Sequence, residues 1–112
     1  MSDYSFGTVV LVAFPFTDQI ATKQRPAVVI SSATYQHERP DLIILAITSQ
    51  LRATVAFGEA SVKDWQAAGL IKPSALKPIV TTIETRLVRK ALGTLSPNDQ
   101  QRLKAVIAAI IG

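Results

Sequence analysis

The stretch KQRPAVVISS, residues 23–32, places two cations directly before an apolar run that has the composition of a buried strand. Steric conflict with Pro26 pushes the residue before it, Arg25, into extended backbone, and the strand that follows anchors this backbone. The guanidinium of Arg25 should therefore be held in one direction. Its planar fork of donors and its permanent charge suit a phosphate. A structural ion pair with a carboxylate such as Asp18 is the alternative.

The neighbouring segments have the same strand composition. Besides residues 27–31, the β-branched and apolar runs at 8–14 and 42–47 predict strands, and shorter strands are expected at 54–57 and 79–85. Turn or polar residues separate these runs. Five or so short strands with few helices predict a small, strongly curved antiparallel sheet or barrel with appended helices.

Two helices are expected, one short and one at the C-terminus. Residues 62–69 end in Gly69, which suits a C-terminal cap. The second helix is predicted over 97–111, because Ser96 is a good N-cap, Pro97 suits the first helical position and Asp99 favours the positive end of the dipole. Its outward face is mostly alanine, which fits either a partner subunit or plain exposure.

Composition limits the classes of function. The chain has 112 residues, enough for a single domain over 1–112, and a net charge of +4 that weakly favours polyanionic partners. It has no cysteine and one histidine, so a thiolate or histidine metal site is not expected. No apolar run reaches the roughly 20 residues of a membrane span, and no signal peptide is evident, so we expect a cytoplasmic protein.

Two further stretches carry candidate binding residues. The connection at 15–24 is long for a hairpin and carries Phe16, Thr17, Asp18 and Lys23. An aromatic ring beside hydroxyls and a cation can stack a base and hold a phosphate, although a solvated loop with its phenylalanine folded onto the core explains it equally well. The apolar strand at 42–47 ends abruptly in three hydrogen-bonding side chains, Thr48, Ser49 and Gln50.

Taken together, these stretches resemble the MazF/PemK family of toxin endoribonucleases. GTVVLVAFPFTD (7–18) resembles the family's first strand and loop, KQRPAVVISS its Arg-Pro signature and LAITSQ (45–50) its third-strand signature. AGLIKPSALKP and VTTIETRL look like its Pro-Ser segment and the strand before an Arg-Leu pair. The resemblance covers nearly the whole chain. After Ser74, the stretch ALKPIV lacks the polar residue that some members use to contact RNA.

The resemblance implies a mainly β (α+β) fold, a small curved antiparallel SH3-like or CcdB-like β-barrel with a short helix and a C-terminal helix. It implies a homodimer that cleaves single-stranded RNA at short sequences without metal or cofactor, and that is neutralised by an antitoxin with a disordered acidic segment. The family's catalytic arginine and threonine fall on Arg25 and Thr48. Its groove-lining serine falls on Ser74, and Ser49 and Gln50 follow the catalytic threonine.

The chemistry of RNA agrees with such a site. The 2′-hydroxyl of RNA is itself the nucleophile, so a protein needs to position the strand, move protons and stabilise charge on phosphorus. Arg25 and Thr48 can stabilise the charge on phosphorus. Asp18 and Glu84 are the candidate general bases, whereas His37 is expected to be a surface loop residue.

Two other functions stay open. A CcdB-like toxin that poisons gyrase would share the fold, but the C-terminus AAIIG lacks the aromatic cluster on which such toxins depend. A basic β-barrel that binds nucleic acid without cutting it also fits the composition.

Overall fold

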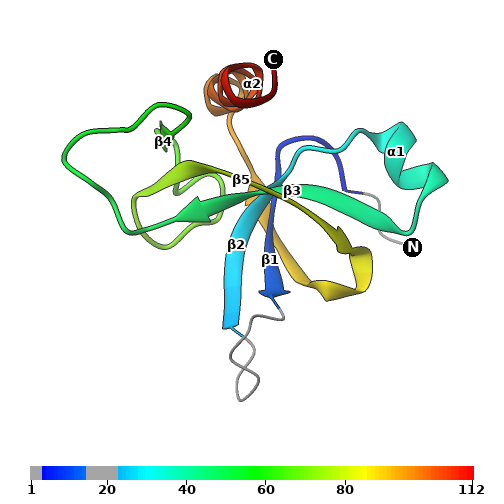
Figure 1. Ribbon diagram of the computed structural model, residues 1–112. Helices are drawn as coiled ribbons and strands as arrows, with labels where there is room; N and C mark the ends of the chain where they lie inside the picture. The colour runs from blue at the N-terminus through cyan, green and yellow to red at the C-terminus, as the bar shows by residue number, and fades with distance from the viewer. Residues whose placement is uncertain (1–3, 15–22) are drawn as a thin grey trace.

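The computed structural model describes residues 4–14 and 23–112 and consists of one strongly curled antiparallel sheet with two helices (Figure 1). Its six strands follow the order β4-β5-β3-β2-β1-β6. The predicted mainly β fold with a C-terminal helix is confirmed. The elements are β1 (Thr8–Phe14), β2 (Lys23–Val29), α1 (Ala33–Glu38), β3 (Asp41–Thr48), β4 (Ala60–Val62), β5 (Ser74–Glu84), the 3-10 turn η1 (Thr85–Leu87), β6 (Val88–Thr94) and α2 (Pro97–Ile111).

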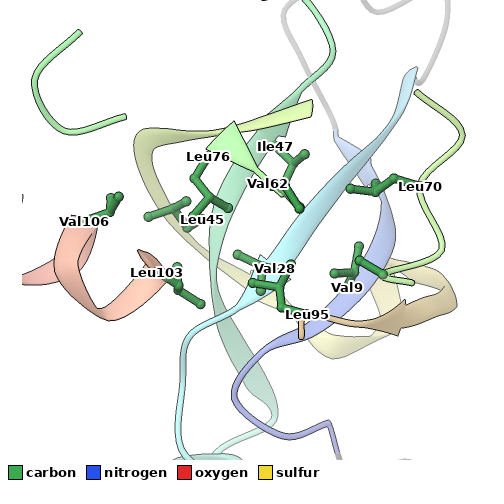
Figure 2. Packing of buried hydrophobic residues seen from close by; sticks show 11 residues of the cluster. Val9, Val28, Leu45, Ile47, Val62, Leu70, Leu76, Leu95, Leu103 and Val106 are labelled. Carbon is green, nitrogen blue, oxygen red and sulfur yellow. The ribbon is translucent and has the colours of Figure 1, made fainter. Parts of the chain in front are cut away.

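The sheet buries side chains on both faces, which explains why its central strands are apolar throughout rather than alternating. In β2, Val28 contributes to the core cluster beneath α2, while Ala27 and Val29 contribute to a second cluster on the opposite face. Figure 2 shows Leu103 and Val106 of α2 turned toward the strands of the first cluster. Tyr4, Leu87 and Val88 pack against the second cluster.

Helix α2 spans the residues that its sequence predicts. The Ser96 side chain caps it by accepting a hydrogen bond from the Asp99 amide at 3.2 Å. Asp99 does more than complement the helix dipole, because it is fully buried and its carboxylate accepts hydrogen bonds from the amides of Lys63 and Asp64 at 2.9 and 2.8 Å. This carboxylate therefore ties α2 to the chain that follows β4.

Two predicted elements are wrong, and two strands and one α-helix were missed. Residues 54–57 form no strand: Val55 and Phe57 lie exposed in a loop, and the short strand that pairs with β5 is β4 instead. Residues 63–69 make consecutive turns rather than the predicted helix. Gly69 nonetheless ends them at a φ of +82°, as its cap prediction requires. Helix α1 and strands β4 and β6 were not predicted.

Strand β5 is longer than predicted and carries an irregularity. Between the pairs Leu45↔Val80 and Ile47↔Leu76, three residues of β5 oppose one residue of β3. Pro78 lies in this bulge, where its missing N–H breaks no ladder hydrogen bond. The bulge bends β5 beside the end of β3, where Thr48 lies.

Candidate active site

The ends of β2 and β3 bring Arg25 and Thr48 to one groove. The β2–β3 pairing includes Ala27↔Ala46, and continuing it by two residues sets Arg25 opposite Thr48. Neighbouring strands lie about 5 Å apart, so the two backbones come close. Both side chains line the same groove. Two sequence motifs that are 23 positions apart in the chain thus meet at one place.

This groove runs along β5 and has a volume of about 690 Å³. Its apolar lining residues are mainly aliphatic, and most of its polar ones come from the ends of β2 and β3 and from β5. The described lining residues are Arg25, Pro26, Ile44, Ala46, Ile47, Thr48, Gln50, Lys77, Ile79, Thr81, Thr82, Ile83, Glu84 and Leu87. Such a volume lies within the range of small-molecule sites and accommodates one or two nucleotides at most.

Thr48 is fixed at the end of β3 by the residues that follow it. The Gln50 amide donates a hydrogen bond to the Thr48 Oγ1 at 3.1 Å. This contact occupies a lone pair of the hydroxyl and leaves its hydrogen to donate to a ligand. The Thr48 side chain is half-buried, so a rigid strand end presents one hydroxyl to the groove.

Arg25 is exposed and lies at the groove's rim. Its backbone pairs with Val12 of β1, and Pro26 after it is half-buried. A second hollow, of about 420 Å³, adjoins the groove here, and Ser49 lines it together with Arg25, Thr48 and Gln50. Four of the predicted site residues therefore gather around one rim.

Glu84, a candidate base, also lines the groove but at its other end. Glu84 pairs with Asp41 at the start of β3, whereas Thr48 pairs with Ala75 at its end. Seven residues of strand separate these pairs, or about 20 Å at 3.3 Å per residue. The Glu84 carboxylate accepts a hydrogen bond from Arg86 at 2.7 Å and is largely exposed.

The other predicted residues lie elsewhere. Ser74 is buried, its hydroxyl donates to the Lys72 carbonyl at 2.9 Å, and it is not among the residues that line the groove. Phe16, Thr17 and Asp18 lie outside the described residues, and Lys23 is the first residue of β2. His37 is exposed, as expected, but it lies in the last turn of α1 rather than in a loop.

Lys77 is a groove residue that the sequence did not point to. Its ammonium lies 3.0 Å from a carboxylate oxygen of Glu59, and the other oxygen of Glu59 accepts a hydrogen bond from the Ala56 amide at 3.2 Å. The bond from Lys77, followed by that from Ala56, lowers the pKa of the Glu59 carboxyl below its ordinary value. The available signal was a lysine beside Pro78, the residue that bends β5.

Other kinds of site find little support. Within residues 4–14 and 23–112, no three His, Asp or Glu side chains gather as they would around a metal ion. Neither described helix is long and apolar enough to cross a membrane.

Comparison with solved structures gives the same fold. The chain superposes on an endoribonuclease in complex with its cognate antitoxin from a Mycobacterial species, with a TM-score of 0.76 at 12% identity, over 100% of this chain and 96% of that one. It matches MazE-MazF from Deinococcus radiodurans with a TM-score of 0.72 at 19% identity, over 97% and 94%. For the Mycobacterium tuberculosis toxin MazF-mt6 the TM-score is 0.70 at 19% identity, over 92% and 91%.

Comparison at the level of sequence assigns a family. A search among curated proteins found no match. The model of the PemK-like, MazF-like toxins of type II toxin-antitoxin systems matches residues 5–111, which span both strand-end motifs and all of α2. The chain therefore belongs to the PemK-like, MazF-like toxin family.

Proposed function

We propose that this protein is a toxin endoribonuclease that cuts single-stranded RNA at short specific sequences without a metal ion. The observation that carries the proposal is the meeting of Arg25 and Thr48 at the rim of one groove. Membership of the toxin family and the likeness to structures described as endoribonucleases support it.

In the proposed reaction the 2′-hydroxyl of one nucleotide loses its proton to a base, and its oxygen bonds to the adjacent phosphorus. The bond from phosphorus to the 5′-oxygen of the next nucleotide breaks, and that oxygen takes up a proton. The products are a 2′,3′-cyclic phosphate and a 5′-hydroxyl. Arg25 would donate to the nonbridging oxygens as their charge grows, and the Thr48 hydroxyl would donate alongside it.

The general base has two candidates, Asp18 and Glu84. Glu84 is paired with Asp41, about 20 Å along β3 from Thr48, and is therefore too far away to serve a phosphate that Thr48 holds. Asp18 is the other candidate; it lies outside the described residues, in the segment between β1 and β2, and Arg25 is two residues from the start of β2. Phe16, Thr17, Lys23, Ser49, Gln50 and Ser74 stay predicted RNA-binding residues.

A direct assay tests this function. Purified protein is incubated in EDTA with a long single-stranded RNA, and the new ends are mapped and their chemistry determined. We expect cuts at one short sequence that leave cyclic phosphate and 5′-hydroxyl ends. RNA that is bound but stays intact would support a non-catalytic binding protein, and cleavage that EDTA abolishes would contradict the metal-free mechanism.

We also propose that an antitoxin neutralises the protein by laying a disordered, acidic segment along the groove. Solved relatives include complexes with a cognate antitoxin. Arg25 and Lys77 offer positive charge to such a segment, and the aliphatic lining residues offer contact to its apolar side chains. A small acidic protein encoded beside the toxin should bind it and block RNA cleavage competitively. Failure of every adjacent gene product to bind in a pull-down would contradict this.

The working unit is proposed to be a homodimer. Large apolar side chains such as Phe57 and Ile71, which are 84% and 90% exposed in the single chain, support an interface. Sedimentation equilibrium at tens of micromolar, a concentration at which modest interfaces associate, should give twice the chain mass of 12.1 kDa. A monomer under those conditions would contradict it.

A further inference from the structure

Beside the groove lies a smaller depression, here called the side hollow, which shares Thr48, Gln50 and Lys77 with it. The loop after β3 and strand β4 form its far wall. Its described lining residues are Thr48, Gln50, Leu51, Arg52, Thr54, Val55, Glu59, Ser61, Ala75 and Lys77. Because three residues line both spaces, a chain lying in the groove can continue into the side hollow.

Strand register explains why these side chains share one face. Ala75 of β5 is paired with both Thr48 of β3 and Ser61 of β4, so the three residues form a row across the sheet. Lys77 lies two residues beyond Ala75, at the start of the bulge in β5, and lines the side hollow together with Ala75 and Thr48. Lys77 and Thr48 also both line the groove, so the two side chains border the same two spaces.

The ammonium of Lys77 is held in place rather than free to sweep the surface. Glu59 binds it at 3.0 Å, and Glu59 is itself fixed by the Ala56 amide. The side chains of Lys77 and Glu59 are only 25% and 11% exposed. An ammonium has three donors, so one bond to Glu59 leaves two for a ligand.

Charge and size point to the kind of ligand. The cations lining the described part of the side hollow are Lys77 and Arg52, against the single carboxylate of Glu59. The volume is about 60 Å³, which is room for about four water-sized spheres. That space suits the oxygens of one phosphate and is too small for a nucleobase.

We propose that the side hollow binds the RNA phosphate next to the scissile one, with Lys77 as the residue that grips it and Glu59 as the residue that positions Lys77. This inference rests on the proposed RNA-cleaving function. In this arrangement the scissile phosphate lies at Arg25 and Thr48. The RNA chain then crosses β5, so that the neighbouring phosphate contacts Lys77. Holding two successive phosphates fixes the direction and register of the RNA.

The test uses full-length protein and a short RNA that contains the mapped cleavage sequence, with 2′-deoxyribose at the scissile nucleotide so that it cannot be cut. Each phosphate in turn is replaced by an uncharged methylphosphonate, and binding is measured for the wild type, for Lys77→Gln and for Lys72→Gln. Lys72 is the matched control, because it is exposed and is not among the residues that line either space.

For the wild type, one methylphosphonate next to the scissile position should weaken binding about tenfold, the typical worth of a charge-assisted hydrogen bond. The Lys77→Gln variant should bind unmodified RNA about tenfold more weakly than the wild type does. The methylphosphonate next to the scissile position should not weaken its binding further. The slope of log affinity against log salt should fall by about 0.7, as expected for one phosphate of a single strand. Lys72→Gln should keep the full wild-type pattern, and Lys77→Arg should restore part of it.

Thermal unfolding shows whether each variant is folded, and Lys77→Met, which keeps the aliphatic stem, replaces Lys77→Gln if the latter unfolds. A Lys77 variant that is folded and keeps the wild-type sensitivity at every linkage would overturn the inference and leave Lys77 as a tether between β4 and β5. In that case the wild type still cuts RNA, so the proposed function stands. A wild type that neither binds nor cuts RNA would overturn both.

Discussion

The two ends of the groove are built differently, although one strand, β5, connects them. At the Thr48 end, Lys77 pairs with Glu59, and the two side chains are 25% and 11% exposed. At the opposite end, Arg86 pairs with Glu84, and the two side chains are 75% and 60% exposed. The first pair is also anchored to backbone through the Ala56 amide. Only one end therefore holds its charges in fixed positions.

This difference indicates where chemistry can take place. An exposed ion pair in water contributes little and constrains its partners weakly, because solvent competes for both. Catalytic groups need placement to within a fraction of an ångström, which rigid strand ends and anchored partners can supply. Thr48 and Lys77 meet that requirement at one end, whereas the charged pair at the Glu84 end is exposed.

The largest effect is expected from Arg25→Ala. Loss of a donor that stabilises transition-state charge typically lowers the rate about 10² to 10³-fold, and we expect at least that in single-turnover cleavage. The fold should survive, since Arg25 is exposed and contributes little to stability. A variant that melts at markedly lower temperature, yet cuts at the wild-type rate where folded, would make Arg25 a structural ion-pair partner.

Thr48→Ala should lower the cleavage rate somewhat less than Arg25→Ala does, because a neutral hydroxyl stabilises growing charge less than a guanidinium does. Thr82→Ala is its control at the other end, since Thr82 also lines the groove but is exposed on β5. The cleavage rate of Thr82→Ala should stay within a few-fold of the wild-type rate, as expected for a residue that contacts RNA away from the reacting phosphate. Equal losses of cleavage rate in the two variants would contradict the view that only the Thr48 end of the groove carries the chemistry.

Glu84→Gln should lower the cleavage rate less than tenfold. The carboxylate lies about 20 Å of strand from Thr48, and a general base must come within hydrogen-bond reach of the proton that it removes. General-base catalysis contributes about 10² to 10⁴-fold. A loss of that size in a folded Glu84→Gln protein would move the chemistry to the exposed end.

The smallest effect concerns pH and the Glu59 pair. The pKa of Glu59 is lowered in the folded protein, chiefly by its bond to Lys77, so its stabilising contribution is present above the unfolded value of about 4.3 and is lost as pH falls through the folded value. The free energy of unfolding of the wild type should exceed that of Glu59→Gln near neutral pH and converge with it in acid. A difference that does not change with pH would show that the carboxylate's charge is irrelevant.

Local sequence signals predicted the parts of the fold that depend on local physics. Ser96 and Pro97 mark the start of α2, and the apolar runs at 8–14 and 42–47 became β1 and most of β3. Strand β6 carries exposed Arg89 and Lys90 and is recognisable only through its pairing with β1. The run at 54–57 has strand composition but no neighbour to pair with.

The candidate site also contains residues that short motifs predict and residues that only the fold reveals. Arg25 beside Pro26 and Thr48 at a strand end were visible in short motifs, and the sheet register brings them together. Lys77 could not be singled out, because its place in the groove depends on the bulge at Pro78 and on Glu59, which is 18 residues away in the chain. Ser74 is the opposite case. Its place in the Pro-Ser motif predicted a groove residue, but its hydroxyl donates to the Lys72 carbonyl instead.

Single-turnover cleavage by Arg25→Lys, in EDTA and at saturating protein, tests the central claim most directly. Lysine keeps the positive charge but loses the planar, two-pronged donor. If Arg25 clamps the scissile phosphate, the variant should bind RNA almost as the wild type does and yet cut it at least about 10²-fold more slowly. A folded Arg25→Lys protein that cuts within a few-fold of the wild-type rate would contradict the account, because charge alone would then suffice.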